Sequence, residues 1–355
     1  MSRFFSEKYS GLRAYVPGEQ PRNQKYIKLN TNESPFPPHP EVAKAVLEES
    51  SLLRLYSDPE CTDLRKILSQ RLQIEPDMLL MSNGSDEILN FAFMAFCDQN
   101  SPAVFPDLTY GFYPVFAQIN NLPWKEIPLK KDFSICVSDY FGVSGTIFFA
   151  NPNAPTGIAL SRDEIRQIVM ENPKNMVVVD EAYVDFGAES CIPLVSEFDN
   201  LLVVQTFSKS RSMAGGRLGF GVGSPEVIGD LNTIKYSTNP YNVNRLTAAA
   251  GIACLKNDGY NMENCRVIQK NRERCVKQLK ELGFEMTDSS ANFIFVRHPE
   301  IDGEELYLRL KERGILIRHF SLEKISDYNR ITIGTEDQMD RLVETIKDIL
   351  KEKQI

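Results

Sequence analysis

The chain contains 355 residues, 42% of them hydrophobic and 25% charged, and its formal net charge is −8. This composition is ordinary for a globular protein. The chain is longer than one hydrophobic core usually organises, which favours two domains. The negative charge argues against nucleic acid or an anionic membrane surface as the main partner.

Targeting, redox and metal signals are weak. The N-terminal stretch MSRFFSEKYSGLR has no apolar core of signal-peptide length, and charges interrupt the chain too often for a membrane span. The seven cysteines form no CxxC motif, which predicts reduced thiols in a cytoplasmic protein. The three histidines are scattered, so we expect no metal site.

Strand and helix signals alternate from residue 78 onward, which predicts βαβ units and a mostly parallel sheet sandwiched by helices. The first unit is a strand at 78–82, the turn Asn83-Gly84-Ser85 and an apolar-faced helix from Asp86. Further helices are predicted at 110–119, after a capping box of Ser161 and Glu164, and after Ser224-Pro225. Further strands are predicted at 103–105, 146–150, 177–180, 201–205 and 218–222.

The pattern of predicted helices and strands changes near residue 257. A long charged helix is predicted at 262–282, and it leads into strands at 293–297, 315–319 and 331–333. This pattern predicts a large α/β domain at 46–256 and a smaller α+β domain at 257–355.

A carboxylate follows one of the buried strands directly. Residues 176–179 are apolar, as in a strand covered on both faces, so Asp180 falls at its carboxyl end, where open α/β sheets build their sites. An acid there can pair with a protonated pyridine nitrogen, and such a pair contributes about 4 kcal/mol at ~4 Å and an effective dielectric near 20. The alternative interpretation of Asp180 is a helix N-cap or a surface ion pair.

The segment 203–221 carries the most informative lysine. An apolar run ends in a hydroxyl-rich turn, where Lys209 lies between two serines and Arg217 follows eight positions later. A lysine in this setting can form an imine with an aldehyde cofactor while Ser208 and Arg217 hold the cofactor's phosphate. The alternative is a solvated loop lysine.

A second anion site is predicted at the turn Gly84-Ser85-Asp86, between a strand and a helix. The first amides of a helix point away from its body, and together with the helix dipole they favour a bound anion. An ordinary capped helix would carry the same short motif.

These motifs together resemble a known family. Asp180-Glu181-Ala182-Tyr183, Ser208-Lys209 and Arg217 are similar to the pyridoxal-phosphate aminotransferases of the aspartate-aminotransferase fold. The segment 151–157 also belongs to that broad pattern, and the class II branch of histidinol-phosphate aminotransferases is indicated by further segments at 15–18, 28–35, 56–59, 241–244, 291–293 and 330–335. The resemblance covers essentially the whole chain. It implies pyridoxal 5′-phosphate as cofactor, the type I fold of such transferases, and an N-terminal arm at 1–45 that joins the small domain.

The resemblance also implies roles for residues around the cofactor. Tyr110 matches the aromatic residue that stacks on the ring, a contact that contributes about 0.5–1.5 kcal/mol beyond its buried area. Tyr183 matches the tyrosine that hydrogen-bonds the phenolic oxygen, and Thr206 lies near the phosphate. Tyr56 matches a tyrosine that reaches the phosphate from the neighbouring subunit, so a homodimer is expected. Without the resemblance, Tyr110 could belong to the core and Tyr56 to a locally packed turn.

One position departs from the family pattern. The asparagine expected directly before Pro-Thr-Gly is replaced by Ala154, and an asparagine stands one place earlier, at Asn153. Either Asn153 reaches the cofactor through a shifted backbone, or the phenolic oxygen loses one donor and the imine pKa rises.

Substrate recognition is expected from two arginines and two N-terminal residues. Arg330 matches the arginine that clamps an α-carboxylate, and a planar guanidinium suits this bidentate pairing. Arg318 matches the arginine associated with the substrate's own phosphate. Tyr15 and Asn32 belong to segments that fold over the site in relatives, where they could also serve simply as dimer clasps.

The implied reaction converts histidinol phosphate and 2-oxoglutarate into imidazole acetol phosphate and glutamate, in histidine biosynthesis. Lys209 would act as general base and acid, and two half-reactions in one pocket predict ping-pong kinetics. An aromatic amino acid aminotransferase is the main alternative, because pocket shape decides the substrate. A phosphothreonine-type decarboxylase and a non-catalytic cofactor-binding regulator are more distant alternatives.

Overall fold

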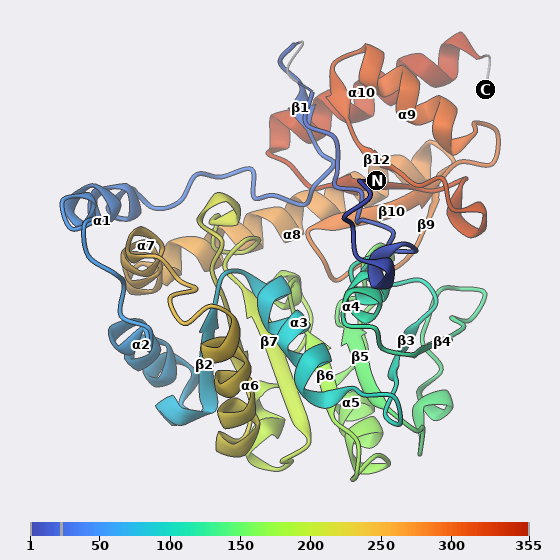
Figure 1. Cartoon of the computed structure of the whole chain (residues 1–355). Coiled ribbons are helices and arrows are strands. Elements are labelled where there is room, and N and C mark those ends of the chain that lie inside the picture. Colours follow the sequence, from blue (N-terminus) through green and yellow to red (C-terminus); the bar gives the residue numbers. More distant parts are fainter. Residues whose placement is uncertain (1, 22–23, 354–355) are drawn as a thin grey trace.

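Two β-sheets with separate apolar cores organise the molecule (Figure 1). The computed structural model describes residues 2–21 and 24–353. Within these residues the larger sheet has seven strands, in the order β2-β8-β7-β6-β5-β3-β4. The bounds are β2 Leu79–Ser82, β3 Ala103–Pro106, β4 Trp124–Ile127, β5 Thr146–Ala150, β6 Val177–Asp180, β7 Leu201–Thr206 and β8 Gly219–Val222.

The larger sheet is mostly parallel, as predicted. Only the two pairs made by β8 differ, because β8 runs antiparallel to both β2 and β7, while β7, β6, β5, β3 and β4 pair in parallel. Every residue of β5, β6 and β7 is buried, which is typical of parallel strands covered on both faces.

Helices cover the two faces of this sheet, and alternate strand residues point to each of them. On one face Phe148, Val178 and Leu202 pack with α3 (Ser85–Phe96), α4 (Tyr113–Ile119) and α6 (Pro225–Thr238). On the other face Val177, Val179 and Val203 pack with α2 (Thr62–Leu72), α5 (Arg162–Met170) and α7 (Arg245–Lys256). Helix α1 (Pro40–Ser50) lies against α7. The result is a three-layer α/β arrangement (Figure 1).

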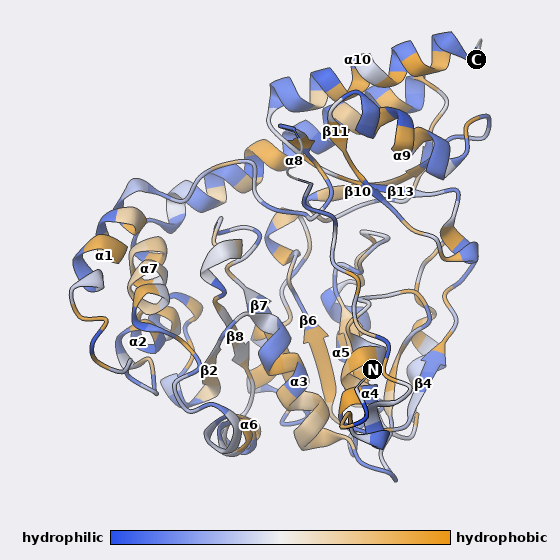
Figure 2. Ribbon diagram, turned by 45° about the horizontal axis from the view of Figure 1, so that its top comes forward, coloured by the Kyte–Doolittle hydropathy of each residue, from blue (hydrophilic) through white to orange (hydrophobic). Residues whose placement is uncertain are grey.

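The smaller sheet is antiparallel, in the order β12-β13-β10-β9. Its strands are β9 Glu285–Met286, β10 Phe293–Arg297, β12 Arg318–His319 and β13 Asn329–Thr332. Helices α8 (Asp258–Glu281), α9 (Gly303–Glu312) and α10 (Glu336–Glu352) pack on it. Figure 2 shows that hydrophobic and hydrophilic residues alternate along α10, which buries the hydrophobic ones against the sheet.

The N-terminal segment belongs to this part of the molecule. Strand β1 (Ile27–Lys28) pairs in parallel with β11 (Ile315–Leu316), which lies between α9 and β12 in the chain. The remaining turns are 3₁₀ helices at Glu7–Tyr9, Pro76–Met78, Val137–Tyr140, Val184–Phe186, Ile192–Ser196, Ala214–Gly216 and Glu323–Ile325. Every helix in the described residues is too short or too polar to cross a lipid bilayer.

Several predicted boundaries are confirmed and others are shifted. The capping box of Ser161 and Glu164 and the N-cap at Ser224 are present. The helix predicted from residue 110 starts at Tyr113, because 107–112 form the turn that brings Tyr110 to the pocket described below. The helix predicted at 262–282 begins at Asp258. The strand predicted at 315–319 is divided at Ile317 into β11 and β12, which belong to different sheets.

Candidate active site

A cavity of about 490 Å³ lies at the carboxyl ends of the parallel strands, where the larger sheet meets the smaller one. Its volume is within the range of small-molecule sites. Most of the residues singled out from the sequence line it: Tyr15, Asn32, Ser85, Asp86, Tyr110, Asp180, Tyr183, Thr206, Ser208, Lys209, Arg217, Arg318 and Arg330. Residues that are more than three hundred positions apart therefore share one pocket.

Lys209 lies just beyond the end of β7 and opens onto this cavity. Its Nζ donates a 3.1 Å hydrogen bond to the carbonyl of Thr31, and it lies 5.8 Å from the centre of the Tyr183 ring. Burial, together with the positive charge of Arg330, lowers the pKa of Lys209 to about 8, against the opposing negative charge of Glu33. The amine is therefore easily deprotonated, as a nucleophile requires, and a freely solvated loop lysine does not describe it.

Asp180 ends β6, and its side chain is only 4% exposed. The carboxylate accepts a 3.1 Å hydrogen bond from the backbone amide of Ala182. Burial raises the pKa of Asp180 to about 7, and the neighbouring charge of Asp86 adds to this effect. A cationic ring nitrogen placed beside Asp180 would compensate the buried charge and hold the carboxylate ionised. The predicted pyridine-nitrogen partner is consistent with this environment.

The turn between β2 and α3 forms an anion cradle. Gly84 has φ +80°, and a Cβ on it would lie 2.5 Å from Arg217 Nη2, so a side chain there would displace the guanidinium. A Cβ on Gly219 would lie 2.6 Å from the amide nitrogen of Ser85. Gly84 is the N-cap of α3 and supplies no side-chain acceptor to the first turn. The first amides of α3 and the Arg217 guanidinium therefore suit a phosphate.

Polar contacts hold this cradle in shape. Asp86 Oδ2 lies 3.1 Å from Arg217 Nη2, and Asp86 Oδ1 accepts a 2.7 Å hydrogen bond from the hydroxyl of Tyr110. Thr206 Oγ1 donates to Ser208 Oγ across 2.9 Å. A single carboxylate thus places both the predicted stacking aromatic and the predicted phosphate-binding arginine. The residues present fit a phosphorylated pyridine aldehyde.

Tyr183 meets an asparagine that is distant in the sequence. Asn32 Nδ2 donates a 3.0 Å hydrogen bond to the Tyr183 hydroxyl, and Thr332 Oγ1 donates to Asn32 Oδ1. Asn32 has φ +57°, a conformation that asparagine tolerates better than most residues. The sequence assigns Asn32 to a segment that folds over the site, and the structure places its side chain beside Tyr183, the residue predicted to bind the phenolic oxygen.

Asn153 does not reach the cavity in the described part of the chain. Its Nδ2 donates to the carbonyl of Leu108 at 3.0 Å and to Thr156 Oγ1 at 3.2 Å, and its Oδ1 accepts from Thr109. These bonds hold two loops together and use the side chain fully. The cavity is lined by Ala154 instead. In the structure the Asn153 side chain thus bonds to its own loops, and its role at the cofactor stays a prediction.

The two predicted substrate arginines differ in their surroundings. Arg330 Nη2 donates to the carbonyl of Asn30 at 3.1 Å, the guanidinium lies over Phe293 and Phe320, and its buried Nε has no partner among the described residues. Buried donors are normally satisfied, so Arg330 is suited to an incoming carboxylate. Arg318 donates to the backbone carbonyls of Val16 and Pro17 at 3.1 and 3.3 Å.

Arg318 thereby holds an N-terminal strap over the cavity mouth, defined here as residues 13–19. Tyr15 of the strap stacks on Phe112 with ring centres 4.2 Å apart. The carboxylate of Glu19 contacts Tyr307 and Lys311 of α9. The strap therefore contacts both parts of the molecule, and its residues Tyr15, Val16 and Gly18 line the cavity.

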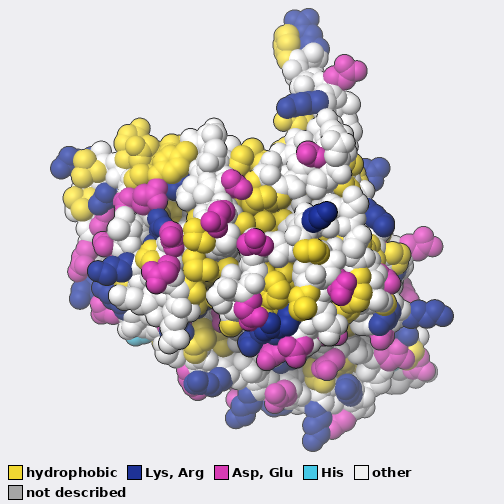
Figure 3. All heavy atoms as spheres, turned by 90° about the horizontal axis from the view of Figure 1, so that it is seen from below, with side chains coloured by type: hydrophobic (Ala, Val, Ile, Leu, Met, Phe, Trp, Pro, Cys, Tyr) yellow, Lys and Arg dark blue, Asp and Glu magenta, His cyan; other side chains and the backbone are white. Residues whose placement is uncertain are grey.

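Tyr56 lies away from the cavity of its own chain. Its side chain is 79% exposed and stacks on Tyr241 at 4.6 Å. Leu47, Leu53 and Leu55 nearby are also exposed. Figure 3 shows hydrophobic side chains gathered on the side of the molecule where α1 lies in Figure 1.

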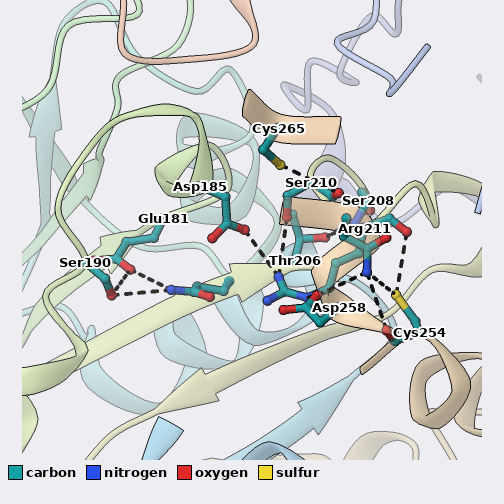
Figure 4. Close-up of polar contacts among 12 residues, drawn as sticks. Glu181, Asp185, Ser190, Thr206, Ser208, Ser210, Arg211, Cys254, Asp258 and Cys265 are labelled. Atoms are coloured by element: carbon teal, nitrogen blue, oxygen red, sulfur yellow. Dashed lines mark hydrogen bonds and ion pairs between the residues drawn. The ribbon is translucent and has the colours of Figure 1, made fainter. Parts of the chain in front are cut away.

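Sequence reasoning missed the polar groups that support the site from behind. Glu181 accepts hydrogen bonds from Ser190 Oγ at 2.7 Å and from Gln205 Nε2 at 2.8 Å (Figure 4). Burial raises the pKa of Glu181 to about 7. Arg211 lies between Asp185 and Asp258 in the same figure. No local motif predicts these partners, because each comes from a different element.

Comparisons with known proteins agree with this geometry. The pattern of the family aminotransferase class I and II matches residues 24–346. The chain is 48% identical to a histidinol-phosphate aminotransferase of Brachyspira hyodysenteriae, over 99% of this chain and 100% of that protein. It is 46% identical to the enzyme of the same name from Acinetobacter baumannii, with 98% of each covered.

Solved structures share the fold. The histidinol-phosphate aminotransferase from Sinorhizobium meliloti in complex with pyridoxal-5′-phosphate superposes with a TM-score of 0.83 at 23% identity, covering 92% of each chain. The histidinol-phosphate aminotransferase from Clostridium acetobutylicum gives 0.84 at 22% identity, covering 92% of this chain and 99% of that one.

Proposed function

Because the chain belongs to the class I and II aminotransferase family, we propose that it transfers the amino group between histidinol phosphate and 2-oxoglutarate. It is a pyridoxal-phosphate-dependent transaminase, and the near-half identity to histidinol-phosphate aminotransferases over their full length supports this substrate pair. The observation that carries the proposal is the shared cavity. It holds a readily deprotonated lysine, a buried aspartate, an anion cradle and two arginines.

When bound, pyridoxal 5′-phosphate supplies an aldehyde carbon for amines and a ring that withdraws electrons. In our proposal, Lys209 Nζ carries the cofactor covalently, and the α3 N-terminus, Ser208 and Arg217 bind the phosphate. The Asp180 carboxylate holds a proton on the ring nitrogen. Tyr110, fixed through Asp86, stacks on the ring. Tyr183 and Asn32 direct their polar atoms toward the phenolic oxygen.

Proton transfer is assigned to one atom. In the cofactor-loaded enzyme, Lys209 Nζ would remove the proton from the substrate α-carbon, hold it and return it, while the cofactor would supply the electron-withdrawing ring. The lowered pKa of Lys209, caused mainly by burial, keeps a usable fraction of the amine unprotonated near neutral pH. Tyr15 and the rest of the strap exclude water from this step.

Substrate binding is divided between the arginines. Arg330 is assigned to the α-carboxylate of glutamate, since its Nε lacks a partner in the described residues. Arg318 is assigned to the phosphate of histidinol phosphate, because it lines the same cavity and its hydrogen bonds within the described residues go to neutral carbonyl acceptors. A phosphate would be the stronger acceptor for its guanidinium.

The working unit is proposed to be a homodimer in the cytoplasm, with residues 46–256 as the cofactor domain and 257–355, joined by the arm at 1–45, as the smaller domain. The exposed leucines around Tyr56 support the dimer, because a monomer rarely leaves such a patch in water. Tyr56 would reach the phosphate of the neighbouring subunit. The seven free cysteines support a reducing compartment.

The dimer is tested by Leu53→Asp, with Leu308→Asp as control because Leu308 is an exposed leucine on α9. Sedimentation velocity should find a dimer for the control and a monomer with little activity for Leu53→Asp. An active Leu53→Asp monomer would contradict the shared site.

The substrate is tested by steady-state kinetics with histidinol phosphate, phenylalanine, tyrosine and glutamate as amino donors. We expect the highest kcat/KM with histidinol phosphate. Arg318→Gln should lower that value about tenfold or more, since hydrogen bonds to charged groups contribute about 1.5–3 kcal/mol, while the glutamate reaction changes little. Preference for phenylalanine or tyrosine without any effect of Arg318→Gln would identify an aromatic aminotransferase instead. Release of carbon dioxide would identify a decarboxylase.

A further inference from the structure

Arg211 is a buried arginine directly behind the reactive lysine. It lies two positions after Lys209, it is only 4% exposed, and it does not belong to the residues that line the cavity in the described chain. Its Nη1 lies 3.3 Å from Asp185 Oδ2, and its Nε lies 3.2 Å from Asp258 Oδ1. Figure 4 shows the two carboxylates on different sides of the guanidinium. An uncompensated charge in such a place would be strongly destabilising, so the pairs must form.

The partners of Arg211 connect the lysine segment to three other elements. Asp185 belongs to the 3₁₀ turn that directly follows Tyr183. Asp258 is the first residue of α8 and also pairs with Arg71 of α2. Arg211 therefore connects the Lys209 segment to the turn that follows Tyr183, which is also predicted to contact the cofactor. The positive charges of Arg71 and Arg211 balance the negative charges of Asp185 and Asp258 in this cluster.

The ends of the segment are held by packing of Phe207 and Met213 in the core and by backbone hydrogen bonds of 2.9 and 3.0 Å, whereas the backbone groups of residues 210–212 make only weak contacts within the described chain. The carbonyls of Ser210 and Arg211 meet the thiols of Cys265 and Cys254 at 3.9 and 3.8 Å, and thiols are weak donors. Within the segment, the amide of Ser212 donates to the Lys209 carbonyl at 3.4 Å, which is a long hydrogen bond. The Arg211 guanidinium also lies over the Phe207 ring at 5.1 Å. The ion pairs of Arg211 are thus the charged side-chain contacts that connect the middle of this segment to Asp185 and Asp258.

We propose that Arg211 is a positioning residue for Lys209, acting through its ion pairs with Asp185 and Asp258. It does not touch substrate or cofactor. It fixes the position of the Lys209 backbone. The Lys209 Nζ is thereby placed relative to the cofactor ring, which the turn after Tyr183 helps to hold. This inference rests on the proposed function, because it requires that Lys209 carries the cofactor. A misplacement of about 1 Å can lower a rate about a hundredfold, so a buried anchor outside the pocket can govern catalysis.

The test compares Arg211→Met with a matched control, Arg272→Met. Arg272 is a half-buried arginine of α8 that donates to the carbonyls of Phe186 and Ala291 at 2.9 and 2.6 Å. It supports the same 3₁₀ turn and helix but is not attached to residues 207–213. After Arg211→Met, Asp258 keeps Arg71 as partner and the side chain of Asp185 is 23% exposed, so neither carboxylate is isolated in an apolar core.

Three measurements on the cofactor-loaded proteins separate positioning from general support. The midpoint temperature of thermal unfolding should fall by a similar amount in both variants. The pH midpoint of the visible absorbance, which reports the proton on the Lys209 nitrogen bound to the cofactor, should move by at least about 0.5 units in Arg211→Met and stay unchanged in Arg272→Met. With glutamate as donor, kcat should fall about tenfold or more in Arg211→Met with KM changed less than about threefold.

Arg211→Lys should recover only part of the loss, because a single ammonium lacks the fork that spans two carboxylates. Asp185→Asn should give a smaller shift in the same direction, and it carries the test if Arg211→Met does not fold. The proposal would be overturned if Arg211→Met and Arg272→Met had equal midpoints and equal kcat. If Arg211→Met does not fold, equal values in Asp185→Asn and wild type would overturn it. A wild-type protein without visible cofactor absorbance would instead overturn the proposed function.

Discussion

Asn32 and Tyr183 are 151 residues apart in the chain, yet the Asn32 side-chain amide donates a 3.0 Å hydrogen bond to the Tyr183 hydroxyl. The pair lies in the cavity beside Lys209. Ala154 stands where an asparagine was expected and cannot donate, so Asn32 is the available amide on this side of the site. The bond also favours the ionised form of Tyr183, whose pKa burial otherwise raises.

Asn32→Asp should therefore lower kcat about five- to tenfold, since a buried hydrogen bond contributes about 1 kcal/mol. Aspartate keeps the size of the side chain and tolerates the positive φ, but it has no amide donor. The measurement is kcat for the glutamate half-reaction together with the position of the visible band.

Asn329→Asp is the control for Asn32→Asp. Asn329 is fully buried in β13 and donates to the carbonyl of Gly303 at 2.9 Å, away from the cavity. Its variant should lose stability and keep kcat. An unchanged kcat in Asn32→Asp would show that Tyr183 works without this partner.

Gly84→Ala should weaken cofactor binding about tenfold. The new Cβ would lie 2.5 Å from Arg217 Nη2, so the guanidinium must leave the phosphate cradle, and φ +80° strains any L-residue. The dissociation constant is measured by adding cofactor to the cofactor-free protein and following absorbance.

Gly142→Ala separates strain from displacement. Gly142 also has a positive φ, +59°, but nothing lies within 4 Å of its would-be Cβ. Both variants should lose about 1 kcal/mol of stability, and only Gly84→Ala should lose cofactor affinity. Equal affinities would mean that Arg217 contributes little to phosphate binding.

The rate of cofactor incorporation into cofactor-free protein should depend on pH through Lys209. Only the neutral amine attacks an aldehyde, and burial lowers the pKa of Lys209 to about 8. The rate should rise roughly tenfold per pH unit below this value and level off above it. Stopped-flow absorbance between pH 6 and about 10 measures the midpoint.

Two variants should move this midpoint in opposite directions. Arg330 lowers the pKa of Lys209 and Glu33 raises it, so Arg330→Gln should shift the midpoint upward and Glu33→Gln downward. Shifts of the same sign in both variants would refute the electrostatic account of this site.

Asp180→Asn should stabilise the cofactor-free protein above neutral pH while abolishing transamination. The folded-state pKa of Asp180 is raised to about 7 by burial, above the ordinary value of 3.8. Below both pKa values the carboxyl group is neutral in the folded and in the unfolded state, so it does not change the free energy of unfolding. As pH rises from about 4 to about 7, the unfolded chain ionises first and folding stability is lost, by on the order of 4 kcal/mol.

Urea unfolding of cofactor-free Asp180→Asn and wild type should coincide near pH 4 and diverge by pH 8, with the variant more stable. Glu181→Gln is the neighbouring control, because burial also raises the pKa of Glu181 to about 7 and its side chain faces away from the cavity. It should gain stability and keep activity. A less stable Asp180→Asn protein at pH 8 would contradict the assigned pKa.

Local sequence signals predicted the elements well where a few neighbouring residues decide the conformation. The strand at Thr146–Ala150 and the strand at Val177–Asp180 follow from uninterrupted apolar runs, and both are confirmed. The capping box of Ser161 and Glu164 is confirmed for the same reason, since it closes within one helical turn. The start of α4 was placed three residues early, because apolar character alone does not distinguish a packed turn from a helix.

The sequence by itself thus determined the layered α/β architecture and the lysine, aspartate and glycine-turn motifs, because each depends on residues that are close in the chain. Only the tertiary structure decided that Asn32 faces Tyr183, that Asn153 serves its own loop, and that Arg211 ties Lys209 to α8. Those pairings depend on which strand ends lie side by side and on which polar groups remain unsatisfied after folding, and local periodicity contains neither.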